Sequence, residues 1–369
     1  MIRRQFVNVI ACHSKTEMCS LHRLDVSKHL FYPSTADAEA ANSKAPAIER
    51  LPGLPAPTMN LQSSPTKKGG ARQLLLFALG GSEGRILCSD EAGHTLLYDA
   101  DAHCSHTMPA HRAGDMERDP VAISVARPGQ EDDLYVMNRS AYELERFTSF
   151  DVLSFGGEGR RGIWHWDSLP PLPESALLYR IGSHAVVDGG RTICVSGLRR
   201  GGSSTYCFDT VEREWRKAGD FALPFAGGAE YVPDLKLWLG FSDSCIRLEH
   251  LCAADLSGAM DKPPTLQRVW QDVVPVRVTP KRSFKLVNLG EGRFFCIAKL
   301  YHYTSWEWKG ARPRYYFSDS DMDVTDKVDP EEVVLTGVEA VTTGGGLRMV
   351  RHKSISCVFR DYQMIRAVL

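Results

Sequence analysis

The stretch IGSHAVVDGGRTICVSGLRRGGSSTYCFDTVEREWRKAGDFALP, from Ile181 to Pro224, decides the fold. It contains four short runs rich in apolar and β-branched residues, at 184–187, 193–196, 205–209 and 215–221. Glycine-rich or charged turns separate these runs, and no helical periodicity lies between them. The stretch therefore predicts four consecutive β-strands joined by short turns.

Four short strands in succession are typical of one blade of a β-propeller. The stretch also resembles a kelch repeat, because the glycine doublet Gly189–Gly190 precedes a strand that ends in glycine, and Asp209 is followed by Trp215. A chain of 369 residues suffices for one propeller of five to seven blades, at roughly 40 to 50 residues each. The sequence therefore favours an all-β protein with a single domain over residues 1–369.

Strand-end aspartates mark similar units along the rest of the chain. They are Asp25, Asp99, Asp151, Asp209, Asp255 and Asp319, with Trp215 and Trp270 as the aromatic residues that follow two of them. We expect each aspartate to accept hydrogen bonds from the next turn, and each tryptophan to pack against a neighbouring blade. The chain begins and ends with incomplete units. We therefore predict a six-bladed kelch-like β-propeller closed by N- and C-terminal strands in one blade.

Residues 33–70 interrupt this succession of predicted strands, because their composition is rich in Pro, Ala, Ser and Lys. Within it, TADAEAANSKAP predicts an exposed loop or a short frayed helix, while IERLPGLPAP and TMNLQSS are compatible with short strands. We interpret the segment as loop-rich and as a candidate for disorder.

Composition excludes several classes of protein. Lys plus Arg number 44 against 45 for Asp plus Glu, so no global field favours nucleic acid or an anionic membrane. No apolar run approaches the roughly 18 residues of a membrane span, and the first residues lack the features of a signal peptide. We expect a cytoplasmic or nuclear protein, whose ten cysteines, without a CxxC pair, stay reduced.

Candidate metal and catalytic residues are few. His103, Cys104, His106 and His111 are metal-binding residue types, but their spacing matches no zinc pattern, and a solvated turn explains them better. His165 and His302 alternate with aromatic residues and are expected in strands. No GxSxG, HExxH or P-loop motif occurs, and no cysteine has the partners of a copper oxidase site. We predict no catalytic residue, metal or cofactor.

Two predicted loops carry residue types that are enriched in binding hot spots. Connections between the second and third strands of every blade emerge on the same face of a propeller. The residues there are Arg199, Arg200, Trp306, Trp308, Lys309 and Arg312. They favour a protein-binding face, with solvated loops whose tryptophans fold back on the blade as the alternative.

The whole chain also resembles a large family of grass proteins related to plant F-box/kelch proteins, whose activity is unassigned. The matching motifs are an RRFVN-like start at Arg3–Asn8, LHR at Leu21–Arg23, LFYP at Leu30–Pro33 and GLRMVRHKS at Gly346–Ser354. The resemblance implies a propeller fold. We expect no F-box, because predicted propeller strands begin at once and leave no room for its roughly 40 helical residues.

We therefore expect a non-enzymatic module that binds a protein partner, of unknown identity, through loops on one face. One alternative is a small-ligand binder or enzyme that uses the mouth of the central channel. Another is a substrate adaptor for a ubiquitin ligase without its own F-box. Titratable side chains that converge at the axis with perturbed pKa values would favour a ligand or enzyme site.

Overall fold

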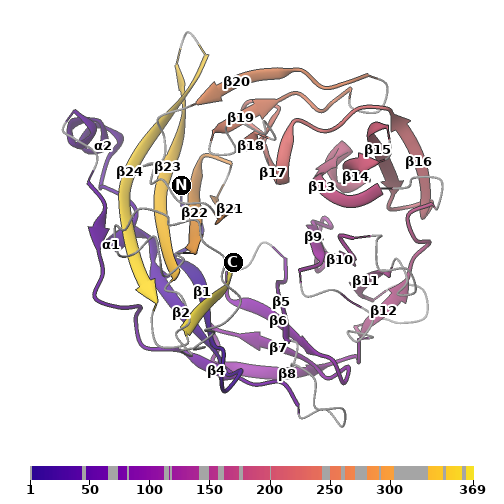
Figure 1. The fold of residues 1–369 in the computed structure, drawn as a ribbon, viewed down its shortest axis with the longest axis horizontal. Helices are drawn as coiled ribbons and strands as arrows, with labels where there is room; N and C mark the ends of the chain where they lie inside the picture. Colours follow the sequence, from indigo (N-terminus) through magenta and orange to yellow (C-terminus); the bar gives the residue numbers. More distant parts are fainter. Residues whose placement is uncertain are drawn as a thin grey trace, which may run out of the picture.

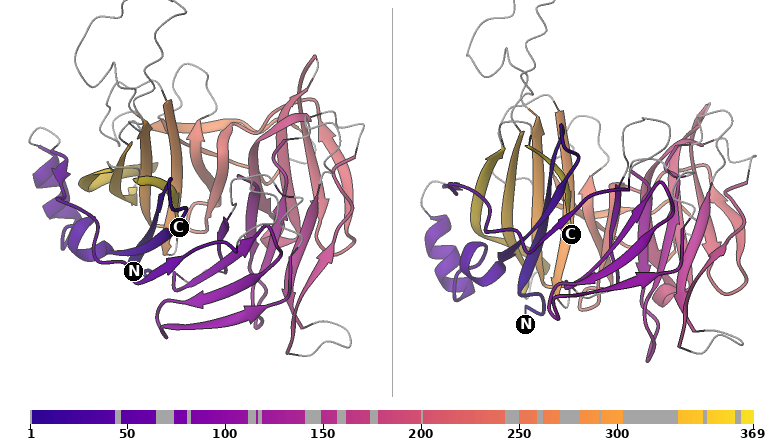
Figure 2. Two further views of the ribbon diagram at one scale, coloured as in Figure 1. Left: turned by 60° about the horizontal axis from the view of Figure 1, so that its bottom comes forward. Right: turned by 90° about the horizontal axis from the view of Figure 1, so that it is seen from below.

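The structure is a computed structural model that describes residues 2–369 except 44–46, 65–73, 81–82, 112–115, 117–118, 141–148, 157–161, 174–177, 200, 243–249, 259–261, 271–280, 291, 303–330, 344–345 and 360–362. Its antiparallel sheets are arranged around a common axis, as in a β-propeller (Figure 1). Figure 2 shows that the strands run between the two faces of this ring.

Three of the described sheets have four strands each. The first contains both chain ends, in the order β25 (Gln363–Val368), β1 (Phe6–His13), β2 (Cys19–Asp25) and β4 (Met59–Leu61). The second is β5 (Leu74–Ala78), β6 (Arg85–Asp90), β7 (Thr95–Asp99) and β8 (Cys104–Met108). The third is β9 (Val121–Val125), β10 (Asp133–Met137), β11 (Phe150–Phe155) and β12 (Trp164–Ser168).

The stretch from Ile181 to Pro224 lies in an eight-stranded sheet made of two antiparallel halves. One half is β13 (Leu178–Val187), β14 (Thr192–Arg199), β15 (Gly202–Asp209) and β16 (Glu214–Gly219). The other is β17 (Phe225–Val232), β18 (Leu237–Ser242), β19 (Leu251–Ala254) and β20 (Leu266–Trp270). The halves join because the innermost strands β13 and β17 pair in parallel over three residues each, 183–185 with 227–229.

The remaining sheet contains β21 (Lys281–Gly290), β22 (Phe294–His302), β23 (Glu331–Thr343), β24 (Gly346–Phe359) and the short β3 (Glu49–Arg50). In Figure 1 the strands β5, β9, β13, β17 and β21 lie nearest the axis, and β8, β12, β16, β20 and β24 lie at the rim. In these five units the first strand therefore supplies the side chains that are closest to the axis.

The two ends of the chain meet in one sheet. Strand β1 pairs antiparallel with β25, with Val9 opposite Val368. Beyond the paired strands, Asn8 and Leu369 exchange two backbone hydrogen bonds of 3.1 and 2.9 Å. The pairing provides hydrogen-bond partners for the backbone N–H and C=O groups along the second edge of β1, which would otherwise be unpaired and exposed to solvent.

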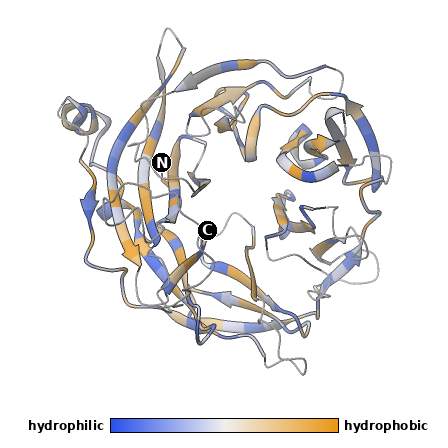
Figure 3. Ribbon diagram, in the orientation of Figure 1, coloured by the Kyte–Doolittle hydropathy of each residue, from blue (hydrophilic) through white to orange (hydrophobic). Residues whose placement is uncertain are grey.

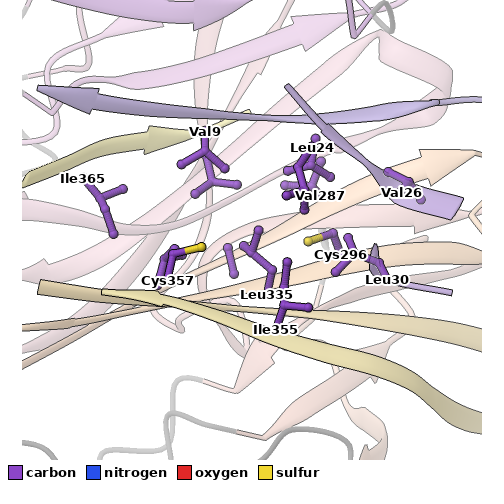
Figure 4. Close-up of a cluster of buried hydrophobic side chains, with 14 of the residues drawn as sticks. Val9, Leu24, Val26, Leu30, Val287, Cys296, Leu335, Ile355, Cys357 and Ile365 are labelled. Atoms are coloured by element: carbon purple, nitrogen blue, oxygen red, sulfur yellow. The ribbon is translucent and has the colours of Figure 1, made fainter. Parts of the chain in front are cut away.

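The hydrophobic core is divided among the interfaces between neighbouring sheets. Figure 4 shows one of these interfaces, where Val9, Leu24 and Ile365 face Leu335, Ile355 and Cys357. These side chains are almost completely buried, and each contributes about 1.5–3 kcal/mol by leaving water. Rim strands need less apolar surface, as Figure 3 shows for the hydrophilic β16.

The described part of residues 33–70 contains a helix and two short strands, in the segments where the sequence is compatible with them. The helix α2 (Thr35–Asn42) begins after Ser34, whose hydroxyl accepts a 3.1 Å hydrogen bond from the backbone N–H of Asp37. Strand β4 extends the sheet of β1 and β2, and β3 pairs in parallel with β24. The segment thus lies along the rim of the ring and connects two neighbouring sheets.

A buried polar contact fastens the start of this segment to β23 and β24. The ring of His352 accepts a 3.2 Å hydrogen bond from the backbone N–H of Tyr32 through Nδ1, so its Nε2 donates to Glu339 Oε2 at 3.1 Å. Thr35 Oγ1 donates to the same carboxylate oxygen at 2.9 Å. The motifs LFYP and GLRMVRHKS therefore meet here, and we call His352, Glu339, Tyr32 and Thr35 the latch.

The prediction that all cysteines are reduced is wrong for two of them. Cys12 and Cys19 lie opposite each other on β1 and β2 and form a disulfide. The spacing of the two cysteines did not indicate the disulfide, because they are seven positions apart and only the hairpin register brings them together. Seven other cysteines of the described residues lie outside this disulfide, and most of them are buried in strands.

Candidate functional site

Most residues of the predicted protein-binding face lie outside the described part of the chain. These are Arg200, Trp306, Trp308, Lys309 and Arg312. Arg199 is the last residue of β14 and pairs with Gly202, so its backbone lies at the hairpin between the second and third strands of its unit. The sequence predicts the protein-binding face at this hairpin.

Described residues beside Arg199 expose apolar surface. The Leu198 side chain is 67% exposed and Tyr179, on the adjoining β13, is 38% exposed. Arg180 is the cross-strand partner of Leu198, and its guanidinium lies 3.9 Å from the carboxylate of Asp119. Two apolar side chains and a basic one therefore share the end of this sheet, and we call Tyr179, Arg180 and Leu198 the rim patch.

The strand-end aspartates lie at turns in most units. Asp99 accepts backbone hydrogen bonds from Asp101 and Ala102, and Asp209 accepts them from Val211 and Glu212. Asp255 accepts one from Ser257, and Asp25 accepts one from Lys28 and thereby caps the helix α1 (Val26–His29). Asp319 lies outside the described residues.

Asp151 differs from this pattern, because it lies inside β11 and not at a turn. Ser149 and Ser168 each donate a 2.9 Å hydrogen bond to its carboxylate. Nε2 of His111 lies 3.4 Å from the same carboxylate. His111 is also buried, and its ring stacks on Trp166 at 4.0 Å, so the prediction that it is a solvated turn residue is wrong.

The two tryptophans of the repeat lie between neighbouring sheets. Trp215 packs against Phe208 of its own unit and Phe150 of the preceding unit, at ring distances of 5.1 and 5.5 Å. Its indole N–H donates a 2.8 Å hydrogen bond to the carbonyl of Pro170. Trp270 packs against the cluster between β17–β20 and β21–β24. Both side chains therefore couple adjacent units.

The remaining histidine and cysteine candidates are dispersed. His165 lies in β12 and His302 ends β22, while Cys104 and His106 on β8 are 3.3 Å apart. His103 precedes β8 with a positive φ of 51°. In the described ranges, no three His, Cys, Asp or Glu side chains are arranged to hold a metal ion.

A cluster of charged residues surrounds the axis of the ring. Glu230 lies on the innermost strand β17, and its carboxylate interacts electrostatically with Lys285 on β21 and with Arg4 just before β1. Lys285 also interacts with Asp119, which precedes β9. Strands β21 and β9 lie on different sides of the axis in Figure 1, so this attraction crosses the axis. We call Arg4, Glu230, Lys285 and His184 the axial cluster.

Burial near the axis shifts the pKa values of these three charged groups. Burial raises the pKa of Glu230, although Arg4 and Lys285 oppose this shift. Burial also lowers the pKa of Lys285 and of Arg4, against the attraction of Glu230. Lys285 is nevertheless exposed to solvent, and Glu230 is half-buried. The side chains are thus enclosed by protein and still within reach of water.

His184 completes the axial cluster from β13. Burial, together with the cations Arg139 and Lys285, lowers its pKa to about 3, so the imidazole is neutral at physiological pH. Its Nδ1 is buried and has no hydrogen-bond partner among the described residues. A Cβ at Gly228 would lie 2.9 Å from His184 Nε2. Glycine at this position of β17 therefore leaves space for the imidazole ring of His184.

Sequence reasoning missed the axial cluster, although it left one signal. The first strands of three successive units each carry one ionisable residue within an otherwise apolar or small run: SHAVV, GAEYV and SFKLV. Because these strands lie nearest the axis, their lone polar residues gather there. A single ionisable residue in one strand does not indicate a site, and only the arrangement of the sheets around the axis brings the three residues together.

The sheets arranged around one axis define a β-propeller. The chain belongs to the family described as "Protein of unknown function (DUF1668)", whose model matches residues 4–358. No curated protein matches the sequence. In the described residues, no helix is long and apolar enough to cross a membrane.

Several solved structures resemble the chain weakly. Hydrazine synthase of Kuenenia stuttgartiensis is 14% identical with a TM-score of 0.35, covering 74% of this chain and 64% of that one. The β-propeller domain of Cps50 (Swd1) from Myceliophteria thermophila is 11% identical with a TM-score of 0.37, covering 93% and 85%. A putative TolB of Agrobacterium tumefaciens is 10% identical with a TM-score of 0.41, covering 98% of both chains.

The chain spans less than two thirds of the length of the hydrazine synthase chain. All three TM-scores lie below 0.5, which is too low a similarity to support an argument about function.

Proposed function

We propose that the protein is a six-bladed kelch-like β-propeller, closed by its two terminal strands in one blade, that binds a protein partner through loops on one face and catalyses no reaction. Six successive groups of four strands and the pairing of β1 with β25 support the blade count and the closure. Rigid sheets with variable loops are a common scaffold for binding.

The rim patch is the observation that carries the proposed binding face. Leu198 and Tyr179 expose apolar surface beside Arg180, in the hairpin region to which Arg199 belongs. Exposed apolar groups next to arginine are typical of the centre and edge of a protein interface. We infer a partner segment that presents an apolar side chain flanked by acidic groups.

Site-specific crosslinking tests this face against the opposite one. A photoreactive amino acid is placed at position 198 or at position 211 of the full chain, and each variant is illuminated in an extract of its source organism. Val211 is a matched control because it is 68% exposed and lies beyond the other end of β15. We expect one protein to crosslink from position 198 and not from position 211.

Substitutions then measure the contribution of the face. Leu198→Asp, or Arg199→Ala combined with Trp306→Ala, should reduce capture of that partner by at least about tenfold, whereas Val211→Asp should leave it unchanged. Equal crosslinking from both positions, or equal loss in the Val211→Asp control, would contradict the proposed face.

A further inference from the structure

Beyond this protein-binding role, we propose that the axial cluster is a binding site for a small anion whose carboxylate or phosphate group lies between Arg4 and Lys285. The proposal assigns a ligand class to the interior of the ring. It is independent of the rim patch, which lies at the end of one sheet.

Convergence from separate parts of the chain is the first argument. Arg4, His184, Glu230 and Lys285 come from the segment before β1 and from β13, β17 and β21. These side chains interact electrostatically with one another, and Arg4 also interacts with Glu83. Asp119, just before β9, acts on Lys285, and Arg139, just after β10, acts on His184. A structural ion pair needs two residues, whereas this arrangement places ionisable groups from most of the ring around one space.

The lack of a close partner for two cations is the second argument. Neither Arg4 nor Lys285 forms a side-chain hydrogen bond or an ion pair within 4.0 Å with another described residue. The carboxylates of Glu230, Glu83 and Asp119 act on these cations only electrostatically, from a greater distance. Cations that are enclosed by protein and lack a close hydrogen-bond partner favour an anion that supplies one.

The shape of the donors specifies the anion. The planar fork of an arginine and the point charge of a lysine together suit a carboxylate or a phosphate. His184 offers a neutral ring whose buried Nδ1 lacks a partner, which suits a hydroxyl group next to the anionic group. The exposure of Lys285 leaves this space open to solvent. The expected ligand is therefore a small hydroxylated organic acid or a phosphate compound.

Titration calorimetry on the full chain tests the site. The probes are succinate, L-malate, inorganic phosphate and uncharged 1,4-butanediol, in a buffer of low chloride concentration. We expect saturable binding with one site for at least one anion and none for butanediol. Tighter binding of malate than of succinate supports the His184 contact, and the ranking of phosphate against the two acids identifies the head group.

Variants separate specific binding from a loss of folding. Lys285→Met and Arg4→Gln should weaken anion binding at least about tenfold, as expected for the loss of a charge-assisted hydrogen bond. Lys262→Met, at an exposed lysine on the chain before β20, should bind as the wild type does. Glu230→Gln should tighten anion binding, a gain that misfolding does not produce. Absence of saturable anion binding, or wild-type affinity in Lys285→Met and Arg4→Gln, would overturn the proposal.

Discussion

The latch between the start of α2 and strands β23 and β24 provides a sharp test of how this fold is held together. Glu339 is 1% exposed, and its carboxylate accepts hydrogen bonds from His352, Thr35 and Arg293. Glu339→Gln keeps the volume and removes the charge. Glutamine offers one carbonyl oxygen where glutamate offers two carboxylate oxygens, so either the His352 and Thr35 side or the Arg293 side then meets the amide N–H₂ group.

We estimate the cost from these contacts. A buried donor without an acceptor costs about 1–3 kcal/mol. The pair with Arg293 adds little, because the arginine side chain is 47% exposed and solvent screens its charge. The expected loss in the free energy of unfolding is therefore about 1–3 kcal/mol at pH 7.5, measured by urea unfolding followed with tryptophan fluorescence.

Glu39→Gln is the matched control for this substitution. Glu39 pairs with Arg348 on the surface, where both side chains are about half exposed. Such a pair contributes about 0–1 kcal/mol. A loss in Glu339→Gln no larger than the loss in Glu39→Gln would refute the argument that the buried latch fastens residues 32–42 to the ring.

The latch also predicts a dependence on pH. Burial lowers the pKa of His352, although Glu339 acts to raise it. A histidine whose folded pKa lies below the unfolded value of about 6.5 contributes stability above that pH and loses it as the pH falls. Without the charge of Glu339 the pKa falls further. The stability difference between wild type and Glu339→Gln should therefore grow from pH 7.5 to pH 5.5, and a constant difference would contradict this account.

Three further predictions concern packing and the disulfide. Gly228→Ala places a Cβ 2.9 Å from His184 Nε2, so it should destabilise the chain by about 1–2 kcal/mol in urea unfolding, while Gly53→Ala, with no atom near its Cβ, should not. Trp215→Ala removes an aromatic contact between two units and should cost about 2–3 kcal/mol in the same measurement, against no more than about 0.5 kcal/mol for the exposed Val211→Ala. Replacing Cys12 and Cys19 by serine should cost about 2.5 kcal/mol from loop entropy, and wild-type protein treated with reductant should show the same shift in its urea midpoint. Unchanged midpoints in any of these variants would contradict the corresponding contact.

Local sequence patterns predicted much of the strand content. Runs of β-branched and aromatic residues with glycine turns indicate strands such as β13 to β16, because side-chain shape and turn chemistry act over a few residues. The Asp at 99, 209 and 255 accepts backbone hydrogen bonds in the turn that follows it, which is also a local interaction.

Contacts between segments that are distant in the sequence were beyond this reasoning. Asp151 looks like the other strand-end aspartates in sequence, yet His111 from a distant segment reaches it inside the core. Lys285, Glu230 and Arg4 are far apart along the chain and interact only because β21, β17 and the segment before β1 approach one another. The Cys12–Cys19 disulfide required the register of a hairpin. In each case the tertiary structure determines which residue the side chain contacts, and the residue types of a short stretch of sequence do not show this.

The pairing of β1 with β25 has a consequence for how the chain is made. Strand β25 is synthesised after every other strand named above, so one side of β1 has no hydrogen-bonding partner until the ribosome has passed residue 368. During that interval the nascent polypeptide exposes an apolar strand, FVNVIACH, with an open backbone edge. The residues of β25 would therefore matter more for the yield of folded protein than their small number indicates.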